Sequence, residues 1–231
     1  MLRTQSGNMY PFVTHTWNPI KGRCLHDCTY CYMKRFPQNE LRLDEKELKT
    51  DLLAGNFIFV GSSTDMFARN VPLEWIQQIL DRCGEAGKNE YLFQSKNPAR
   101  FMSSFIVSRL SRSTPILGTT IETNRLNYEL SKAPDVYSRA MAMQRLYGAG
   151  FRVMVTIEPI VDFDLQPLVE LIERCQPEWV NIGADSKGHN LPEPEWAKVQ
   201  DLIYALLEFT EVKEKPNLAR LKAVARCKEG M

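Results

Sequence analysis

The sequence lacks a long hydrophobic run, an excess of one charge and an export signal, and each absence excludes a class of protein. No apolar stretch approaches the roughly 18 residues that a membrane span needs. The 29 basic and 28 acidic residues leave a formal net charge of +1, so there is no global attraction to nucleic acid or membranes, although a local basic groove is compatible with that balance. Residues 1–10 lack the apolar centre of a signal peptide. We therefore expect a cytoplasmic protein with no membrane partner.

Internal repeats, low-complexity tracts and a clear linker are also missing from the sequence. A chain of 231 residues with 44% hydrophobic residues can form one large domain with a substantial core. We expect this domain to span residues 1–210. Residues 211–231 form a mixed-charge, basic C-terminal tail, which we interpret as a solvated helix or frayed end, with contact to a nucleic acid or another partner as the alternative.

Short β-rich segments alternate with helical patterns along the chain. Helix starts are indicated at Asp44, Pro72, Asn97-Pro98, Asp164 and Pro194, and helical spacing runs from Val136 to Tyr147. The pattern forms six βα units, which favours parallel strands joined by crossover helices. We expect an α/β fold, a partial (β/α)6 TIM-like barrel open at one side. The predicted strands are residues 10–17, 57–62, 91–96, 116–122, 152–158 and 179–184.

Polar side chains gather toward the ends of four predicted strands. Successive side chains of a strand point to opposite faces, so these residues share one face of their strands. Barrels of this kind place their chemistry at the carboxyl ends of the strands, which predicts a shared polar cavity there. Solvated strand ends are the alternative. The polar residues are Gln94, Lys96, Thr120, Glu122, Thr156, Glu158, Asn181 and Asp185.

Three of the six cysteines, Cys24, Cys28 and Cys31, fall within eight residues in a C-x3-C-x2-C spacing. Clustered thiols in a large chain without an export signal indicate a metal site in a reducing compartment. Three thiolates on one loop can hold three irons of a cubane cluster, and the fourth iron stays open to an added ligand. The amino and carboxylate groups of S-adenosylmethionine (SAM) suit that position, and electron transfer into its sulfonium releases a 5′-deoxyadenosyl radical.

The alternative is zinc with His26 as fourth ligand, in a non-catalytic adaptor that binds nucleic acid or protein. Zinc sites usually pair C-x2-C units that are far apart in sequence, and His26 lies too close to both neighbouring cysteines for easy tetrahedral closure. Cys83 and Cys175 lie on apolar helix faces and are interpreted as core residues. Cys227 shows no ligand spacing either.

The C-x3-C-x2-C motif, with Tyr30 before its last cysteine and a strand ahead of it, resembles the radical SAM superfamily. Residues 14–33 resemble an uncharacterised phage-associated branch, and residues 156–162 (TIEPIVD) are similar to spore photoproduct lyase and its relatives. The resemblance covers about residues 10–210. It implies a [4Fe–4S] cluster on Cys24, Cys28 and Cys31, SAM as cofactor, and a flavodoxin- or ferredoxin-like cellular electron donor.

The resemblance also implies SAM contacts. The backbone near Tyr30 would lie by the adenine, and Lys96 would hold the carboxylate. Thr120 and Glu122 match the region of the ribose hydroxyls, with an ion pair from Glu122 to Lys96 or Arg125 as the alternative. Glu158 lies where the last strands meet the adenine or the substrate. The superfamily's Gly-Gly-Glu-like segment, which touches the SAM amino group, is replaced here by Gly61, Ser62, Ser63, Thr64 and Asp65.

The substrate follows only from the similarity to spore photoproduct lyase, which implies repair or modification of nucleic acid. Four arginines offer phosphate partners if they share a face, namely Arg100, Arg109, Arg112 and Arg125. The near-neutral total charge argues against extensive non-specific binding. Peptide or small-molecule modification and cleavage of a different C–S bond of SAM stay open, and the residue that reacts with the substrate is not indicated.

Overall fold

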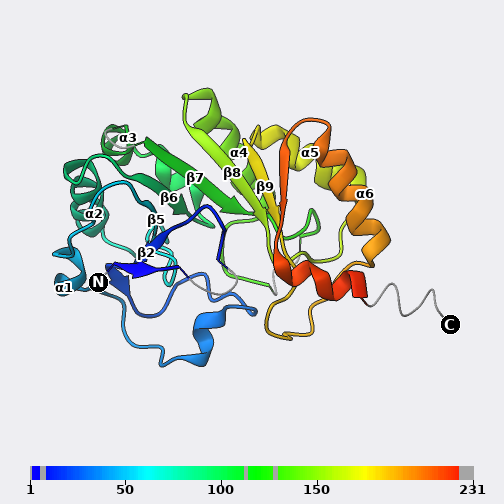
Figure 1. Cartoon of the computed structure of the whole chain (residues 1–231), viewed down its shortest axis with the longest axis horizontal. Helices are drawn as coiled ribbons and strands as arrows, with labels where there is room; N and C mark the ends of the chain where they lie inside the picture. The colour runs from blue at the N-terminus through cyan, green and yellow to red at the C-terminus, as the bar shows by residue number, and fades with distance from the viewer. Residues whose placement is uncertain (1, 6–8, 112–113, 127–129, 224–231) are drawn as a thin grey trace.

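The computed structural model describes residues 2–5, 9–111, 114–126 and 130–223. Arg112, Cys227 and residues 224–231 of the predicted basic tail lie outside these ranges. Within them, the chain forms a mostly parallel sheet with helices packed against it (Figure 1).

The sheet has eight strands in the order β1-β2-β5-β6-β7-β8-β9-β10. β1 pairs antiparallel with β2, and every later neighbour is parallel. Within the described ranges β1 and β10 form the two edges and do not pair, so the barrel is open. This confirms the predicted fold class. The strands are β1 Arg3–Thr4, β2 His15–Trp17, β5 Phe57–Val60, β6 Glu90–Gln94, β7 Thr114–Thr120, β8 Arg152–Ile157, β9 Trp179–Ile182 and β10 Glu211–Glu214.

Helices connect the parallel strands, and most of them begin where the sequence indicated. The Asp44 carboxylate accepts hydrogen bonds from two backbone N–H groups of α1, and Asp135 accepts one from Ser138 of α4 at 2.8 Å. Asn97-Pro98 opens a 3-10 turn before α3 rather than the α-helix itself. The α-helices are α1 Glu45–Leu48, α2 Leu73–Glu85, α3 Ser104–Leu110, α4 Val136–Gly148, α5 Leu165–Cys175 and α6 Trp196–Leu207, and the 3-10 helices are η1 Tyr32–Arg35, η2 Pro98–Met102 and η3 Pro216–Leu218.

The seventh parallel strand, β10, was not predicted. It pairs with β9 from Glu211↔Trp179 to Glu214↔Ile182. The sheet therefore continues past residue 210, the expected end of the barrel, and the first part of the expected tail is a half-exposed edge strand. Lys215 is 6% exposed, and the Lys213 ammonium lies 4.1 Å from the centre of the Trp179 ring.

The two faces of the strands build two separate apolar cores. Outward side chains such as Leu117 and Val180 pack beneath the helices, whereas inward ones such as Leu92 and Ile116 pack inside the barrel. Tyr10 and neighbouring residues also belong to this inner core. The predicted first strand, residues 10–17, is therefore too long, because β2 covers only residues 15–17 and the preceding residues fill the barrel interior.

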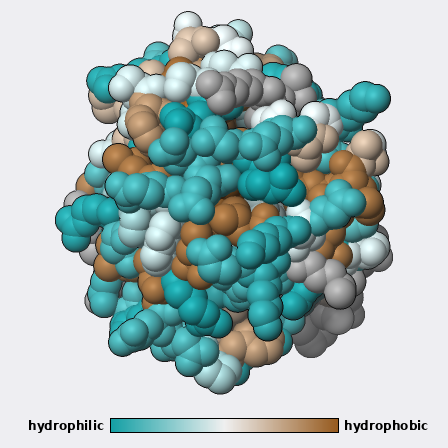
Figure 2. All heavy atoms as spheres, turned by 90° about the vertical axis from the view of Figure 1, so that its left-hand side faces the viewer, coloured by the Kyte–Doolittle hydropathy of each residue, from teal (hydrophilic) through white to brown (hydrophobic). Residues whose placement is uncertain are grey.

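Figure 2 shows the side of the molecule that carries α1 and α2. Hydrophilic side chains dominate this face, and apolar ones appear in separate groups between them. Among the described residues no helix has the length and apolar character needed to cross a membrane.

Candidate functional site

The cysteine loop, residues 22–41, leaves and returns to the barrel through a short two-stranded ladder. β3 (Ile20–Lys21) pairs antiparallel with β4 (Arg42–Leu43) at its base. Gly22 has φ +106°, and a Cβ there would lie 2.2 Å from the Glu40 carbonyl oxygen, so this crossing requires glycine. The loop lies on the side toward which the arrowheads of β7 and β8 point (Figure 1). The ladder thus fixes the loop at the carboxyl ends of the strands.

The three cysteines of this loop are free thiols that lie partly or fully inside the protein. Cys28 is buried, and Cys24 and Cys31 are half-buried. Burial raises the pKa of Cys24 to about 12, and the negative charge of Asp65 adds to the effect. Burial also raises the pKa of Cys31. Cys24 and Cys31 are therefore protonated at neutral pH unless a bound metal displaces their protons.

The donors on the cysteine loop suit a cluster better than a single metal ion. In the described part of the chain, no three His, Cys, Asp or Glu side chains converge on one ion. A cubane has its irons at separate corners, so three thiolates need not converge, whereas zinc requires four ligands around one ion. His26, the expected fourth zinc ligand, has its Nε2 2.8 Å from an Asp65 carboxylate oxygen. Three soft thiols on one loop are thus compatible with a cluster.

Tyr30, Lys96 and Glu122, three of the predicted SAM contacts, come together at the strand ends. The Lys96 ammonium lies 2.6 Å from a Glu122 carboxylate oxygen and 4.3 Å from the centre of the Tyr30 ring. The Tyr30 hydroxyl donates to Glu122 and accepts from Lys96. The cysteine loop therefore contacts the ends of β6 and β7 directly, and the expected Lys96–Glu122 ion pair is confirmed.

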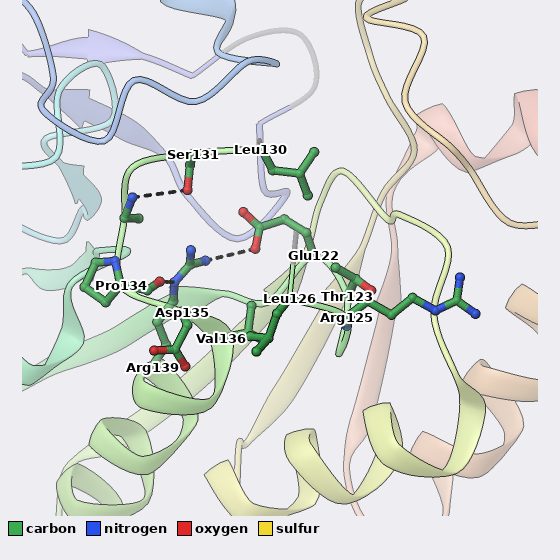
Figure 3. Close-up of a pocket in the computed structure, with 11 residues that line it drawn as sticks. Glu122, Thr123, Arg125, Leu126, Leu130, Ser131, Pro134, Asp135, Val136 and Arg139 are labelled. Carbon is green, nitrogen blue, oxygen red and sulfur yellow. Dashed lines mark hydrogen bonds and ion pairs between the residues drawn. The ribbon is translucent and has the colours of Figure 1, made fainter. Parts of the chain in front are cut away.

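Sequence reasoning missed Arg139, the second cation on Glu122. Arg139 comes from α4, is 4% exposed, and donates to Glu122 at 2.9 Å and to the Thr120 carbonyl at 2.8 Å. Figure 3 shows the guanidinium pointing from α4 to the Glu122 carboxylate. Burial alone would raise the pKa of Glu122, but the charges of Lys96 and Arg139 hold it below its ordinary value.

Arg125, the other expected partner of Glu122, lies elsewhere. Its guanidinium pairs with Asp162 and Asp164, so of the two partners considered for Glu122 the structure shows Lys96 and not Arg125. Arg139 could have been found from the sequence, because it falls on the same apolar helix face as Val136 and Met143.

The segment that replaces the Gly-Gly-Glu-like motif is held by its own hydroxyls. The Asn18 side-chain oxygen accepts from the Ser62 hydroxyl at 3.2 Å and from the Ser63 hydroxyl at 3.0 Å. The Thr64 hydroxyl donates to the Gly22 carbonyl at 3.0 Å. The three hydroxyls thus tie this segment to the base of the cysteine loop.

Gly61 and Asp65 bound the same segment. Gly61 has φ +78°, which permits the turn that follows β5. The Asp65 carboxylate is directed into the protein, where Ser95 and the backbone N–H groups of Phe67 and Lys96 donate to it. Asp65 therefore contributes to the protein framework, in addition to any contact with a ligand.

Thr120 and Glu158 lie in different parts of the barrel interior. The Thr120 hydroxyl accepts from Gln94 at 3.1 Å, and Gln94 accepts in turn from the Tyr10 hydroxyl at 2.9 Å. The Glu158 carboxylate accepts from the Lys215 ammonium at 2.7 Å. The structure therefore gathers Tyr30, Lys96 and Glu122 at the cysteine loop, and pairs Glu158 with a residue beyond β10.

The arginines expected to bind phosphate already have protein partners. Arg100 donates to the carbonyls of Ala68 and Val71, and Arg109 donates to Asp81 at 3.1 Å. Arg125 carries the two aspartate pairs described above. The three described arginines of the predicted set are therefore occupied within the chain.

The combination of an open, mostly parallel barrel and a three-cysteine loop at its carboxyl end places the chain among partial-barrel folds, and solved structures share this fold. Spore photoproduct lyase, as a mutant with bound AdoMet and dinucleoside spore photoproduct, matches with TM-score 0.58 and 10% identity over 89% of this chain and 64% of that chain. Streptococcus suis SuiB bound to S-adenosylmethionine matches with TM-score 0.54 and 11% identity over 86% of this chain and 46% of that chain. These structural neighbours are radical SAM enzymes.

A second mutant of spore photoproduct lyase, with dinucleoside spore photoproduct, matches with TM-score 0.60 and 11% identity over 89% of this chain and 64% of that chain. The chain thus spans 64% of the lyase's length in these matches. At such identities the likeness is one of fold.

The chain belongs to the family described as "Protein of unknown function (DUF5131)", whose model matches residues 9–202. No curated protein matches the sequence. The predicted phage association stays a prediction, since none of these matches shows it.

Proposed function

We propose that the chain is a radical SAM enzyme that holds a [4Fe–4S] cluster on Cys24, Cys28 and Cys31. One observation carries the proposal: the loop with the three free thiols reaches, through Tyr30, the charged pair at the ends of β6 and β7. The same fold binds AdoMet in spore photoproduct lyase and S-adenosylmethionine in SuiB.

When bound, the cluster would supply one electron to the SAM sulfonium, and the resulting 5′-deoxyadenosyl radical would abstract hydrogen from the substrate. The protein's part is to bind and orient. Lys96 offers a point charge to a carboxylate, and Glu122 offers an acceptor to a ribose diol. Thr120 and the residues 61–65 complete this side of the cofactor site, and Glu158 lies where the adenine or the substrate would be met.

For the substrate we propose a nucleic acid. Support comes from the dinucleoside spore photoproduct bound in spore photoproduct lyase. Because Arg100, Arg109 and Arg125 are occupied, phosphate contacts would have to come from other cations. Retention of single- and double-stranded DNA and of RNA, measured against salt, tests this part. Absence of retention at low salt rejects it and leaves the radical chemistry unaffected.

Anaerobic reconstitution tests the enzyme itself. We expect about four irons and four sulfides per chain and reductive cleavage of SAM. Identification of 5′-deoxyadenosine or 5′-methylthioadenosine shows which C–S bond breaks. The Cys24→Ala, Cys28→Ala and Cys31→Ala variants should lose the cluster. A colourless protein that takes up only zinc would reject the proposal and favour the adaptor.

A further inference from the structure

His26 is the one imidazole within the three-residue spacer between Cys24 and Cys28, and it is buried. Only 4% of its surface is exposed, and its Nε2 lies 2.8 Å from an Asp65 carboxylate oxygen. An ionised carboxylate can only accept, so this hydrogen bond places the proton on Nε2. A buried polar ring, on the residue between two cysteines of the motif, is thus held in one orientation by one carboxylate.

The Asp65 carboxylate is itself fixed by the ends of two strands. One oxygen accepts from the Phe67 N–H at 2.9 Å, and the other accepts from the Ser95 hydroxyl and the Lys96 N–H, each at 2.9 Å. These donors follow β5 and β6, so the carboxylate moves only if the strand ends move. The orientation of the His26 ring is thereby fixed relative to the strands of the barrel.

The backbone on the other side of His26 is held as well. The His26 carbonyl accepts from the Lys132 N–H at 2.7 Å, and the Leu130 carbonyl accepts from the Thr29 N–H at 2.9 Å. The segment that contains Lys132 leads into α4, which carries Arg139. The short stretch between Cys24 and Cys31 is therefore fixed from both flanks, with His26 as the residue held at both its ring and its carbonyl.

We propose that His26 and Asp65 are a positioning pair that orients the cysteine loop toward the cluster. The inference rests on the proposed function, since it assigns the pair a role toward the metal group. Residues that hold metal ligands through hydrogen bonds usually affect metal retention when they are removed. The Asp65 carboxylate, which the family resemblance suggested for the SAM amino group, is engaged here by His26 and by the donors at the strand ends.

The experiment compares iron release from anaerobically reconstituted protein to a chelator. We expect His26→Ala and Asp65→Asn to release iron about 10- to 100-fold faster than the wild-type chain. His26→Gln should recover part of the loss, because its amide can donate to Asp65. The double variant His26→Ala/Asp65→Asn should release iron no faster than the faster single variant, because both substitutions break the same contact.

Controls separate positioning from general destabilisation. His15→Ala removes an imidazole of β2 whose Nδ1 lies 3.0 Å from the Thr14 hydroxyl, outside the cysteine loop, and it should leave iron release unchanged. The electron paramagnetic resonance spectrum of the reduced cluster should change in His26→Ala and return toward wild type in His26→Gln. If His26→Ala does not fold, His26→Gln and Ser95→Ala carry the comparison.

Iron release within twofold of wild type in both single variants would overturn the positioning role while the proposed function stands. Additive effects of the two substitutions would also overturn it. A wild-type chain that takes up no inorganic sulfide would overturn the proposed function together with this inference.

Discussion

The buried pair of Glu122 and Arg139 gives the sharpest stability prediction. Arg139→Met keeps an unbranched, largely apolar side chain but removes the cation, so a carboxylate that is 2% exposed is left with Lys96 as its only described cationic partner. The Thr120 and Pro134 carbonyls lose their donor as well. Removing one partner of a buried ion pair costs about 3–5 kcal/mol of unfolding free energy. For a domain of this size the midpoint should fall by roughly 6–20 °C.

The loss should depend on pH, with a sign fixed by the depressed pKa of Glu122. A carboxyl whose pKa is lower in the folded state adds stability above its unfolded value, near 4.5, and that stability disappears as pH falls through the folded value. Arg139→Met moves the folded pKa of Glu122 upward. The difference between variant and wild type should therefore be large at pH 7 and shrink below about pH 4.5.

Urea unfolding of the metal-free chain at pH 7 and at a pH below 4.5 measures the loss of stability. Thermal unfolding at pH 7 gives the midpoint. Arg145→Met, an exposed arginine of the same helix, is the matched control and should stay within about 0.5 kcal/mol of wild type. Glu122→Gln combined with Arg139→Met should recover part of the loss, because no uncompensated carboxylate remains. An Arg139→Met midpoint within 2 °C of wild type at pH 7 would refute the reasoning.

Three further predictions concern the cysteine loop and the core. Gly22→Ala should unfold at clearly lower urea than Gly55→Ala, because only the former places a Cβ 2.2 Å from a backbone oxygen, and a crystal structure with an unmoved loop would contradict this. The pKa of Asp27, held at about 2 by hydrogen bonds from Lys132 and Lys34, should rise in Lys132→Gln. The contribution of Asp27 to folding stability, which is present above about pH 4 and is lost as the pH falls toward 2, should therefore weaken. An unchanged NMR titration of Asp27 would count against this. Cys83→Ala should keep the full iron content of the reconstituted chain, and loss of iron would assign Cys83 to the cluster.

The fold could be predicted because most strands and helices have a local signal. Strands such as Phe57–Val60 are apolar on both faces, as buried parallel strands require, and helix starts are marked by Asp44, Pro72 and Asp164. β10 has no such signal. Its sequence, EVKE, has three charged residues and only one apolar residue. It lies at the sheet edge, where one side of the strand needs no partner.

The site was predictable only where the pattern is local in sequence. The cysteines stand within one loop, and Lys96 and Glu122 are each the last residue of a predicted strand, so their convergence follows from the parallel order of β6 and β7. The Glu158–Lys215 pair joins residues 57 apart, across a strand that the sequence did not indicate. The position of Tyr10 also depends on packing, because the interior of the barrel had to be filled by a segment outside the βα pattern.

Arg139 explains how the charged pair at the strand ends can serve a ligand. Lys96 can offer its charge to a ligand carboxylate only by giving up some of its contact with Glu122. Without a second cation, that exchange would leave the buried Glu122 carboxylate without a compensating charge. Arg139 remains on the second oxygen of Glu122, at 2.9 Å, and keeps the carboxylate paired during the exchange. A zwitterionic ligand, which brings a carboxylate and an ammonium together, would then enter without creating a buried unpaired charge. The same argument predicts that Arg139→Met weakens SAM binding as well as folding, which equilibrium dialysis at low urea can measure separately.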